Sequence, residues 1–512
     1  MDMKTKMNGN RSRLLRFGTW LFTCSAVICV LNSLLLPFGH AIYHYSRFLV
    51  WLAFAGMLGI TTAVFRMIDR IDETHAVHLS RRMGVIYVCG MGILYLLMGY
   101  WLEYTPSGDN FMLYQASQTL ARDGKFEAGS DFLLYFGRYS NQWGFLLLLT
   151  GIYRLLFAAG IRNTFYPLVL IQTVLYLMAF CSLYRIAFRL GGWKGKLRLV
   201  FLLISCLPMT LAATVLYTDT FSLPFVVFTV EAVLRVLDAE ELKTRLKWSL
   251  LSGFLAFLGG QIKMTVLIVM IAAGIVWLLH FPVKQALVCT AAAAGVVMIG
   301  IFAVQQYMLD KVLDRKIYMQ EHTPVIHWIM MSIPSADNPY GGYNSADYAI
   351  TWGMMDEGAD HEEVMNSIYS RMKDKIYTLR YPNRLALAML RKNSAYVSDG
   401  TFGMTEMLDD RPVRWNIISE IVLEPGRFYR VYGAVVTGIW MAQLSATVIG
   451  ACRARKSRQS GQIMLHIACF GILLFLMIWE ARSRYLFGYV PLFLLLAALS
   501  MHQKDDIIKR ID

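Results

Sequence analysis

Residues 83–109 read MGVIYVCGMGILYLLMGYWLEYTPSGD. The first part, Met83 to Trp101, is apolar and long enough to cross a bilayer, which takes about 20 residues of helix. The chain then becomes polar, and Asp109 stands shortly after the point where it leaves the apolar run. A carboxylate held at the boundary between lipid and water can act on a substrate with a polar head and a lipid tail. Asp109 is therefore the first candidate catalytic residue.

The composition of the whole chain predicts an integral membrane protein. Its 512 residues are 56% hydrophobic and 16% charged, with a mean hydropathy of +0.46, whereas soluble globular proteins carry about 25% charged residues. The net charge of +14 comes largely from Lys and Arg in short loops between apolar runs, which is typical of the cytoplasmic loops of polytopic proteins. Nucleic acid is therefore not an expected partner, and membrane lipid is.

Apolar runs predict an all-α polytopic membrane protein with about twelve transmembrane helices. The predicted spans are 17–36, 46–67, 83–101, 164–186, 198–217, 221–237, 248–261, 265–281, 286–305, 429–450, 462–479 and 485–500. The basic start, Met1 to Arg16, precedes an apolar run without a small-residue cleavage site, so the first helix is interpreted as retained. The eight cysteines lie in or beside apolar runs, and we expect no disulfide and no metal site from them.

Basic clusters orient these spans. The stretches 11–16 and 66–82 are rich in Arg, which places the N-terminus and the second loop in the cytoplasm. The third span then ends outside and carries Asp109 to the outer face of the plasma membrane. The same rule places the basic loops 235–247 and 451–458 and the tail 503–512 in the cytoplasm, so both termini are predicted to be cytoplasmic.

For each of two further apolar stretches, only one arrangement keeps the basic loops in the cytoplasm. Residues 143–159 are about 17 residues long, the lower limit for a span, and a span there would turn the basic loop 185–198 outward. We therefore predict a helix lying in the outer interface. The stretch from Trp248 to Phe281 would be about 51 Å long as one helix. We predict two short helices instead, with Gln261, Lys263 and Thr265 in the outer turn.

The chain divides into four parts in this interpretation. They are an N-terminal pair of helices (1–82), a membrane core (83–305) with a first outer loop (102–163), a large extracytoplasmic loop (306–428), and C-terminal helices with a cytoplasmic tail (429–512). A loop as long and as mixed in charge as 306–428 is expected to be folded and functional. A short helix is predicted within it, from Pro382 to Arg391.

Acidic residues at the outer ends of spans are the candidates for chemistry. Asp109 precedes a helical pattern over 110–122 that ends at Gly124, so it is a helix N-cap, a general base, or both. As a base it would take the proton of an acceptor hydroxyl that attacks a sugar's anomeric carbon, a role that contributes about 10²–10⁴-fold. Asp219 also stands at a helix start. It is predicted to cap that helix, with Thr220 as the alternative cap, or to bind a phosphate through a divalent cation.

Two cationic residues at the same predicted face could meet a phosphate. Lys263, in apolar surroundings, either snorkels to the interface or pairs with a lipid phosphate. Arg484 either pairs with Glu480 at i,i+4 or clamps a phosphate with its planar fork. The other residues considered are Glu231, expected to be paired structurally; His322 and His327, whose spacing is not that of a metal site; and Tyr135, Tyr139, Trp143 and Tyr343, which could stack on sugar rings.

These motifs resemble those of C-type (GT-C) glycosyltransferases, most closely the bacterial proteins similar to glycosyltransferase family 39. Gly108-Asp109 followed by Tyr114, Ala116, Leu120 and Gly124 resembles their acidic first-loop motif. Further similar segments are Tyr139–Gly144, the juxtamembrane lead; Asp219, the second acid; Gly259-Gly260 with Lys263; Arg484-Tyr485 with Pro491; and the loop pieces 340–344 and 398–402. Asn110 stands where the family usually has a second acid, and two spans precede the motif where the family core usually has one.

The resemblance implies a GT-C-like fold and a hexosyltransferase. Such an enzyme takes a sugar from a polyprenyl-phosphate donor on the outer face and passes it to a glycan, lipid or protein acceptor. Asp109 would be the base, and Asp219, Lys263 and Arg484 would face the donor phosphate, with a divalent cation such as Mg²⁺ or Mn²⁺ at Asp219. The substrate-binding residues that it implies are Tyr139, Asn141, Gln142, Tyr343, Asn344, Asp399 and Tyr485.

Two other classes of protein fit a polytopic chain with a large outer loop. A lipid-linked glycan flippase or transporter would carry ionisable residues near the middle of the membrane and often shows repeated halves. In this sequence the acids lie at one interface and we find no repeat. A polysaccharide polymerase would also have a large outer loop, but it would join whole lipid-linked repeat units instead of single sugars.

Overall fold

The computed structural model describes residues 9–36, 38–408, 412–454 and 459–499. Helices dominate these ranges, and the β-structure found within them is an isolated bridge between Tyr104 and Pro412. The predicted tail, 503–512, and the end of the predicted basic loop, 455–458, lie outside the described residues. The predicted all-α class is confirmed.

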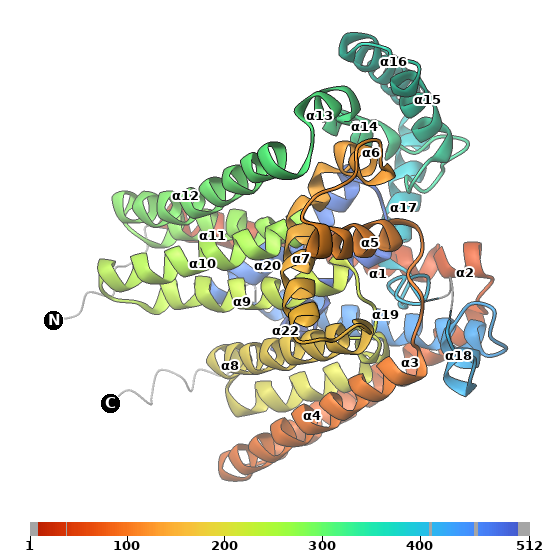
Figure 1. The fold of residues 1–512 in the computed structure, drawn as a ribbon. Helices are drawn as coiled ribbons and strands as arrows, with labels where there is room; N and C mark the ends of the chain where they lie inside the picture. Colours follow the sequence, from red (N-terminus) through yellow and green to blue (C-terminus); the bar gives the residue numbers. More distant parts are fainter. Residues whose placement is uncertain (1–8, 37, 409–411, 455–458, 500–512) are drawn as a thin grey trace.

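Long helices form the body of the molecule (Figure 1). They are α1 (Gly9–Leu35), α3 (Arg47–Arg70), α4 (Glu73–Trp101), α8 (Phe165–Ser205), α9 (Thr218–Asp238), α10 (Leu242–Ile262), α11 (Leu267–His280), α12 (Val283–Tyr307), α19 (Tyr429–Ala454), α20 (Ser460–Ile478) and the shorter α22 (Val490–Ala498). Among the described residues, 8 helices are long and apolar enough to cross a membrane. The molecule is thus polytopic, as predicted.

Two predicted spans differ from the structure: 485–500 is divided between α21 (Ser483–Phe487) and α22 (Val490–Ala498), and 198–217 ends early. Helix α8 is broken at Gly192, whose φ of 62° and ψ of −159° are not helical, and its second part ends at Ser205. The predicted span 198–217 therefore stops early, and a short 3₁₀ turn, η2 (Leu207–Thr210), follows before an irregular stretch. Pro208 explains the stop, because a proline disfavours helical geometry in the residue before it and has no backbone N–H to donate.

The predicted turn within 248–281 is confirmed. Helix α10 ends at Ile262, the 3₁₀ turn η3 (Met264–Val266) follows, and α11 begins at Leu267. Lys263 is the residue between them, with an extended backbone (φ −153°, ψ 120°). This turn brings the Lys263 side chain to one end of the helix bundle.

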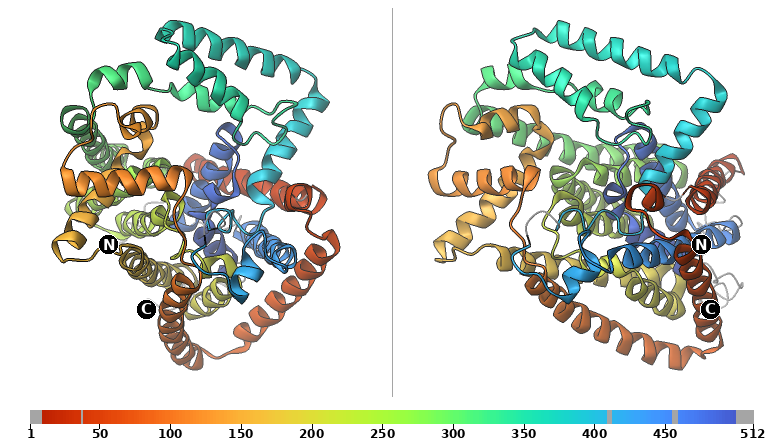
Figure 2. Two further views of the ribbon diagram at one scale, coloured as in Figure 1. Left: turned by 45° about the vertical axis from the view of Figure 1, so that its right-hand side comes forward. Right: turned by 90° about the vertical axis from the view of Figure 1, so that its right-hand side faces the viewer.

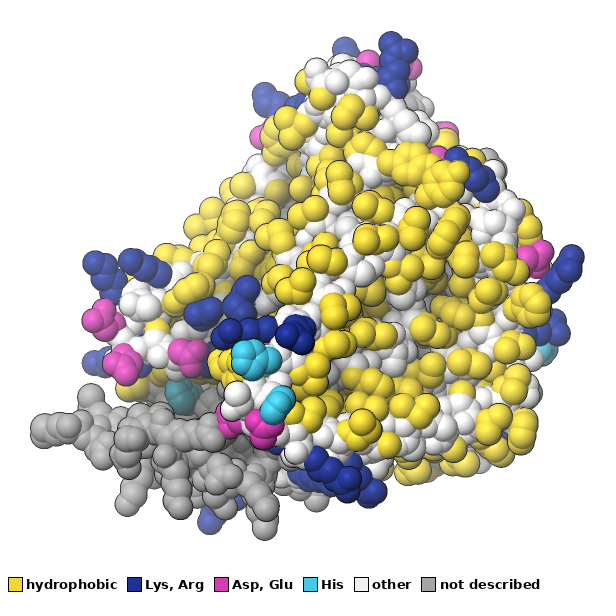
Figure 3. All heavy atoms as spheres, turned by 90° about the horizontal axis from the view of Figure 1, so that it is seen from below, with side chains coloured by type: hydrophobic (Ala, Val, Ile, Leu, Met, Phe, Trp, Pro, Cys, Tyr) yellow, Lys and Arg dark blue, Asp and Glu magenta, His cyan; other side chains and the backbone are white. Residues whose placement is uncertain are grey.

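The bundle has a buried centre and an apolar outer surface. The apolar stretch of α9 is 72% buried and that of α19 is 67% buried, whereas only 17% of the stretch in α12 and 22% of that in α3 are buried. Figure 3 shows a broad hydrophobic surface, with charged side chains gathered toward its ends. Helices α9 and α19 therefore form the core, and α3 and α12 present their apolar sides to lipid.

Interactions between helix ends define two ends of the bundle. At one end Arg198 of α8 pairs with Asp69 of α3, and Arg189 Nη2 lies 2.8 Å from Asp238 Oδ1 at the end of α9. His280, which ends α11, lies 2.9 Å from the hydroxyl of Ser460, which begins α20. The opposite end gathers the starts of α9 and α11 and the turn after α20, and the candidate site lies there.

Shorter helices cover that opposite end (Figure 2, right). The first loop contains α5 (Gly108–Asp123), α6 (Asp131–Arg138), the 3₁₀ turn η1 (Ser140–Gln142) and α7 (Trp143–Ala158). The large loop contains η4 (Met308–Val312), α13 (Arg315–Glu321), α14 (Val325–Met331), α15 (Ser345–Asp356), α16 (His361–Thr378), α17 (Pro382–Val397) and α18 (Ile417–Val422). The remaining short helices are α2 (Phe38–Tyr43) and α21 (Ser483–Phe487). The folded large loop and its helix from Pro382 are as predicted.

Helix α7 corresponds to the apolar stretch that was predicted to lie in the interface. In Figure 1 it runs crosswise to α9 and α10. It touches α10 only near the end of that helix, where Gly144 lies so close to Gln261 that an added Cβ would be 2.4 Å from Gln261 Cβ. A helix of 16 residues in this direction agrees with an interfacial position, since a span takes about 20 residues.

Candidate functional site

Asp109 lies on the exposed surface of the first loop, as the second residue of α5. Gly108 before it has a φ of 51°, a left-handed conformation that favours glycine, so the turn into α5 depends on that residue. The hydroxyl of Tyr135 donates a hydrogen bond of 3.0 Å to Asp109 Oδ1. The predicted helix stop is confirmed, because Gly124 has a φ of 75° and its N–H bonds to the carbonyl of Leu120.

Tyrosines from two parts of the chain surround this carboxylate. Burial is the largest cause that raises the pKa of Tyr135 of α6 and of Tyr139, which follows α6, and the negative charge of Asp109 is the second. Asp109 also adds to the effect of burial on the pKa of Tyr343 and Tyr348, which come from the large loop. In the described part of the chain no Lys or Arg forms an ion pair with Asp109. An accepting oxygen of Asp109 therefore stays open to a ligand.

Asp219 has the opposite surroundings. It is the second residue of α9, and its side chain is 2% exposed. Lys263, from the turn between α10 and α11, forms an ion pair with Asp219 Oδ1. Arg484, from α21, approaches the other oxygen, with Nε 3.7 Å from Oδ2. Residues far apart in sequence thus build one ionic cluster at the end of the bundle that Asp109 also occupies.

This cluster holds two cations against Asp219, and the charge of Glu480 also reaches both of them. The Lys263 ammonium lies 3.8 Å from the ring centre of Tyr485, and the Arg484 guanidinium lies 5.5 Å from that of Tyr217. Aromatic faces stabilise cations at such distances. Arg484 Nε and Asp219 Oδ2 have no hydrogen-bond partner within the described residues. The cluster can therefore receive a further anionic oxygen, which would gain hydrogen bonds from the two cations.

Tyr217 lies close to both Asp109 and the ionic cluster of Asp219. It is the residue before α9, and burial is the main reason that its pKa is raised. The charge of Asp109 acts in the same direction, while Arg484 and a hydrogen bond from Gln142 lower the pKa. Tyr217 is thus within electrostatic reach of both Asp109 and Arg484. The two acids that the sequence placed at the same face belong to neighbouring parts of one region.

The turn after α20 differs from the prediction. Glu480 does not pair with Arg484 at i,i+4, because residues 479–482 are not helical. Instead Glu480 Oε1 accepts a hydrogen bond of 3.1 Å from Arg482, and Oε2 accepts one of 3.1 Å from Tyr485. Arg482 also lies 3.4 Å from Glu406. Arg482 is thus neutralised by two glutamates, and Arg484 is left for Asp219.

The other predicted substrate-binding residues divide into two groups. Asn141 and Tyr343 are exposed, Gln142 is buried beside Tyr217, and the Tyr485 ring lies under Lys263. Asn344 instead caps α15 by accepting from the N–H of Ala346 at 2.9 Å. Both oxygens of Asp399 are held inside the protein.

The bonds of Asp399 give it a positioning role in the fold. Its Oδ1 accepts from the Thr401 hydroxyl at 2.7 Å, and its Oδ2 accepts from the Ser483 hydroxyl at 2.7 Å. The side chain is buried, and burial is the main cause that raises its pKa. Because Ser483 precedes Arg484 in α21, Asp399 fixes the helix that presents Arg484.

The remaining titratable residues lie away from Asp219. Glu231 was predicted to have a structural pairing. Its Oε1 lies 2.6 Å from Arg185 Nε, toward the opposite end of α9. His327 is buried and bonds to Thr351. Among the described residues no group of three or more His, Cys, Asp and Glu could hold a metal ion. A divalent cation at Asp219 would meet Oδ2, because Oδ1 is paired with the ammonium of Lys263.

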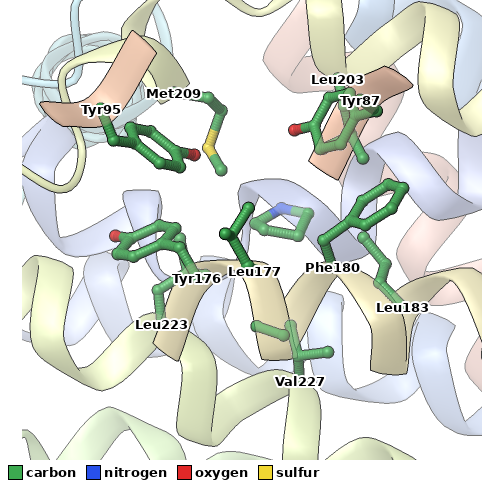
Figure 4. A pocket seen from close by; sticks show the side chains of 12 residues that line it. Tyr87, Tyr95, Tyr176, Leu177, Phe180, Leu183, Leu203, Met209, Leu223 and Val227 are labelled. Atoms are coloured by element: carbon green, nitrogen blue, oxygen red, sulfur yellow. The ribbon is translucent and has the colours of Figure 1, made fainter. Parts of the chain in front are cut away.

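An apolar pocket lies directly behind the start of α9 (Figure 4). Its cavity volume is only about 20 Å³, close to the space of one water molecule, and it lies between α4, α8, α9 and η2. Tyr87, Tyr95, Tyr176, Leu223 and Val227 are among the lining residues. The Tyr176 hydroxyl bonds to the carbonyl of Thr220 at 3.1 Å, so the pocket begins next to the Asp219 turn. Sequence reasoning missed this pocket, although Tyr87 and Tyr95, eight residues apart on α4, share a helix face.

The fold and the distribution of apolar surface define a polytopic, all-α integral membrane protein. The chain belongs to the family described as conserved hypothetical integral membrane protein, whose sequence pattern matches residues 25–504. A comparison with curated proteins gives no match.

Among solved structures, the chain is similar to the crystal structure of ArnT from Cupriavidus metallidurans bound to undecaprenyl phosphate. The two are 12% identical over 81% of this chain and 77% of that chain, with a TM-score of 0.34. A likeness at this score assigns no residue and no activity, so the functional argument rests on the geometry of the site.

Proposed function

We propose that the protein is a membrane glycosyltransferase that moves a sugar from a polyprenyl-phosphate donor to an acceptor outside the cell. The observation that supports this best is the pairing of two environments at one end of the bundle. An exposed carboxylate without an ion pair, Asp109, lies near a buried cluster in which two cations share Asp219. A proton acceptor beside a site for an anionic leaving group is what transfer from a sugar phosphate requires.

The donor phosphate would bind at Lys263 and Arg484. Both cations are already desolvated and held against Asp219 and aromatic rings, so little reorganisation is needed when a phosphate arrives. Asp219 keeps the two cations in place, and without it their mutual repulsion would spread them.

The reaction would be a single inverting displacement. Asp109 takes the proton from the acceptor hydroxyl, whose oxygen forms a bond to the anomeric carbon. The bond between that carbon and the phosphate oxygen breaks, and polyprenyl phosphate leaves with the electron pair. The charge that develops on the leaving oxygen is met by Lys263 and Arg484. The Tyr135 hydroxyl, at 3.0 Å from Asp109 Oδ1, orients the base.

Membrane vesicles containing the protein provide the test. They are supplied with radiolabelled polyprenyl-phosphate sugars, and transfer to the envelope fraction is measured for wild type, Asp109→Asn and Asp109→Ala at equal protein level. Transfer by wild type and its loss in both variants is the expected result. Full activity in both variants would show that Asp109 is not the base. Movement of the intact donor across the bilayer without transfer would favour a flippase instead. Products that contain whole repeat units would indicate a polymerase.

The side of the membrane and the cation are separate parts of the proposal. The bundle end opposite Asp109 carries Arg185, Arg189 and Arg198, and this distribution of positive charge supports an extracytoplasmic position for Asp109. Reporter fusions after residues 109 and 219 should both report an extracytoplasmic position. A divalent cation at Asp219 is tested by chelator titration of purified protein, in which activity restored by Mg²⁺ or Mn²⁺ would support it.

A further inference from the structure

A row of aromatic rings runs from the first loop into the large loop beside Asp109. It begins at Tyr135, whose ring centre lies 4.7 Å from that of Tyr139. The Tyr139 ring is 5.6 Å from Trp328 and 5.3 Å from Trp352. Trp352 lies 3.6 Å from Tyr348, and Tyr348 lies 5.7 Å from Tyr343. Rings from α6, α14, α15 and the segment before α15 thus form one continuous aromatic row.

Part of this row faces solvent. Tyr343 is 41% exposed, and Tyr139, Trp328 and Tyr348 are half-buried, while Trp352 lies beneath them in the small core of the large loop. Packing of that core accounts for Trp352. It does not account for Tyr343, which is exposed and yet lies within electrostatic reach of Asp109.

The row is held in place by a charged clamp below it. Arg138 of α6 bonds through Nε to Glu321 at 2.6 Å and pairs with Asp356 at the end of α15. Its guanidinium also lies 4.6 Å from the ring centre of Trp352. The first loop and the large loop are therefore fastened together at the row, and the rings need little ordering before a ligand binds.

The chemistry of this surface selects its ligand. Partly exposed ring faces bind the C–H faces of sugars by apolar contact, and phenolic hydroxyls beside them can donate or accept hydrogen bonds from sugar hydroxyls. The clamp sets one guanidinium against two carboxylates, and Asp109 adds a further negative charge beside the row, so the surface disfavours an anionic chain. Asp109 stands beside the row, where a terminal hydroxyl of a bound chain would meet it.

We infer that Tyr139, Trp328, Tyr343 and Tyr348 form the acceptor-binding surface and that the acceptor is a neutral glycan, bound through several consecutive sugar rings. This inference rests on the proposed function, because it assigns the acceptor of the same site. It goes beyond that function by excluding a simple lipid or a protein side chain as the acceptor.

Direct binding tests the inference without any chemistry. Full-length protein in nanodiscs is titrated with fluorescently labelled neutral oligosaccharides of four to six residues, released from the envelope polysaccharides of the strain that carries the gene. Tyr343→Ala and Tyr139→Leu should each raise the Kd about tenfold. Tyr343→Phe and Tyr139→Phe keep the rings and should stay much closer to wild type.

A matched variant controls for the loss of a surface tyrosine. Tyr377 in α16 is 62% exposed, and its ring lies under Arg380 instead of in the aromatic row. Tyr377→Ala should bind the oligosaccharides like wild type. Equal loss of binding in Tyr377→Ala, unchanged binding in Tyr343→Ala and Tyr139→Leu, or no binding of any neutral oligosaccharide by wild type would overturn the inference.

Asp109→Asn separates the inference from the proposed function. This variant should bind the oligosaccharides like wild type but fail to extend them. If Asp109→Asn transfers sugar at the wild-type rate while the ring variants still lose binding, the proposed base is wrong and the glycan surface stands. If Asp109→Asn loses transfer while the ring variants bind normally, the glycan surface is wrong and the base stands.

Discussion

The starts of α5 and α9 each carry an aspartate, and the two aspartates have opposite surroundings. Asp109 and Asp219 are each the second residue of a helix, at the same end of the bundle. Asp109 is exposed and its Oδ1 accepts a hydrogen bond from Tyr135, whereas Asp219 is buried between Lys263 and Arg484. A carboxylate that is exposed to solvent can exchange a proton with a substrate. A carboxylate that is neutralised by cations can only hold those cations in place. The helix start fixes where each aspartate lies, and the neighbouring side chains determine what that aspartate can do.

The largest expected effect comes from Asp109→Asn. Loss of a general base lowers the rate of transfer by about 10²–10⁴-fold, and because Asp109 is exposed, the thermal unfolding midpoint should not move. Transfer rates and melting curves are measured side by side. Asp131→Asn is the matched control, since Asp131 is an exposed acid in the first turn of α6, and it should retain wild-type activity. A comparable loss of transfer activity in Asp131→Asn would show that the effect comes from the negative charge of this surface and not from a base at Asp109.

Asp219→Ala is expected to act first on stability. It leaves Lys263 and Arg484 desolvated without their carboxylate, and breaking a buried ion pair costs about 3–5 kcal/mol. The free energy of unfolding in detergent should fall accordingly. The double variant Asp219→Ala with Lys263→Met removes one uncompensated cation and should recover part of the loss. A double variant as unstable as the sum of both single variants would show that the two residues are not coupled.

Arg484→Lys tests whether the shape of the cation matters. The charge is kept but the planar fork, which suits a phosphate, is lost. The KM for the lipid-linked donor should rise about tenfold, in line with one hydrogen bond to a charged group. Arg482→Lys is the control, because Arg482 is engaged by Glu480 and Glu406, and its KM should change much less. Equal changes in the two variants would place the phosphate elsewhere.

The smallest effect is expected for Tyr135→Phe. This variant removes the hydroxyl that bonds to Asp109 Oδ1 and leaves the ring in place. Because the hydrogen bond orients the base, kcat should fall about threefold to tenfold, while the KM for the donor stays constant. A change confined to the donor KM would connect Tyr135 with the phosphate site instead of with the base.

Much of the fold follows from the sequence because lipid imposes a simple rule on each segment. Hydropathy and basic loops predicted the spans, the turn at Lys263 and the common end of Asp109 and Asp219, since every backbone polar group in a span must be satisfied within its own helix. The early end of the 198–217 span and the division of 485–500 between α21 and α22 are exceptions. In the first of these, Pro208 overrides an apolar pattern that fits a helix.

The pairing of side chains could not be predicted in the same way. Asp219, Lys263 and Arg484 come from different turns, and no local pattern says that they meet. The prediction of a Glu480–Arg484 pair assumed a helix that is absent from residues 479–482. Asn344 and Asp399 resembled surface motifs, yet their oxygens bond to the backbone and to hydroxyls within the protein. Such distinctions depend on tertiary contacts, which sequence periodicity does not report.

The order in which the ionic cluster is made has a consequence for biosynthesis. Asp219 and Lys263 enter the membrane early and can neutralise each other while the ribosome is still translating. Arg484 arrives after nearly all the other helices have inserted. A nascent chain would therefore carry a charge-neutral pair at this position. On the proposed function, its affinity for phosphate would develop only when the C-terminal helices dock.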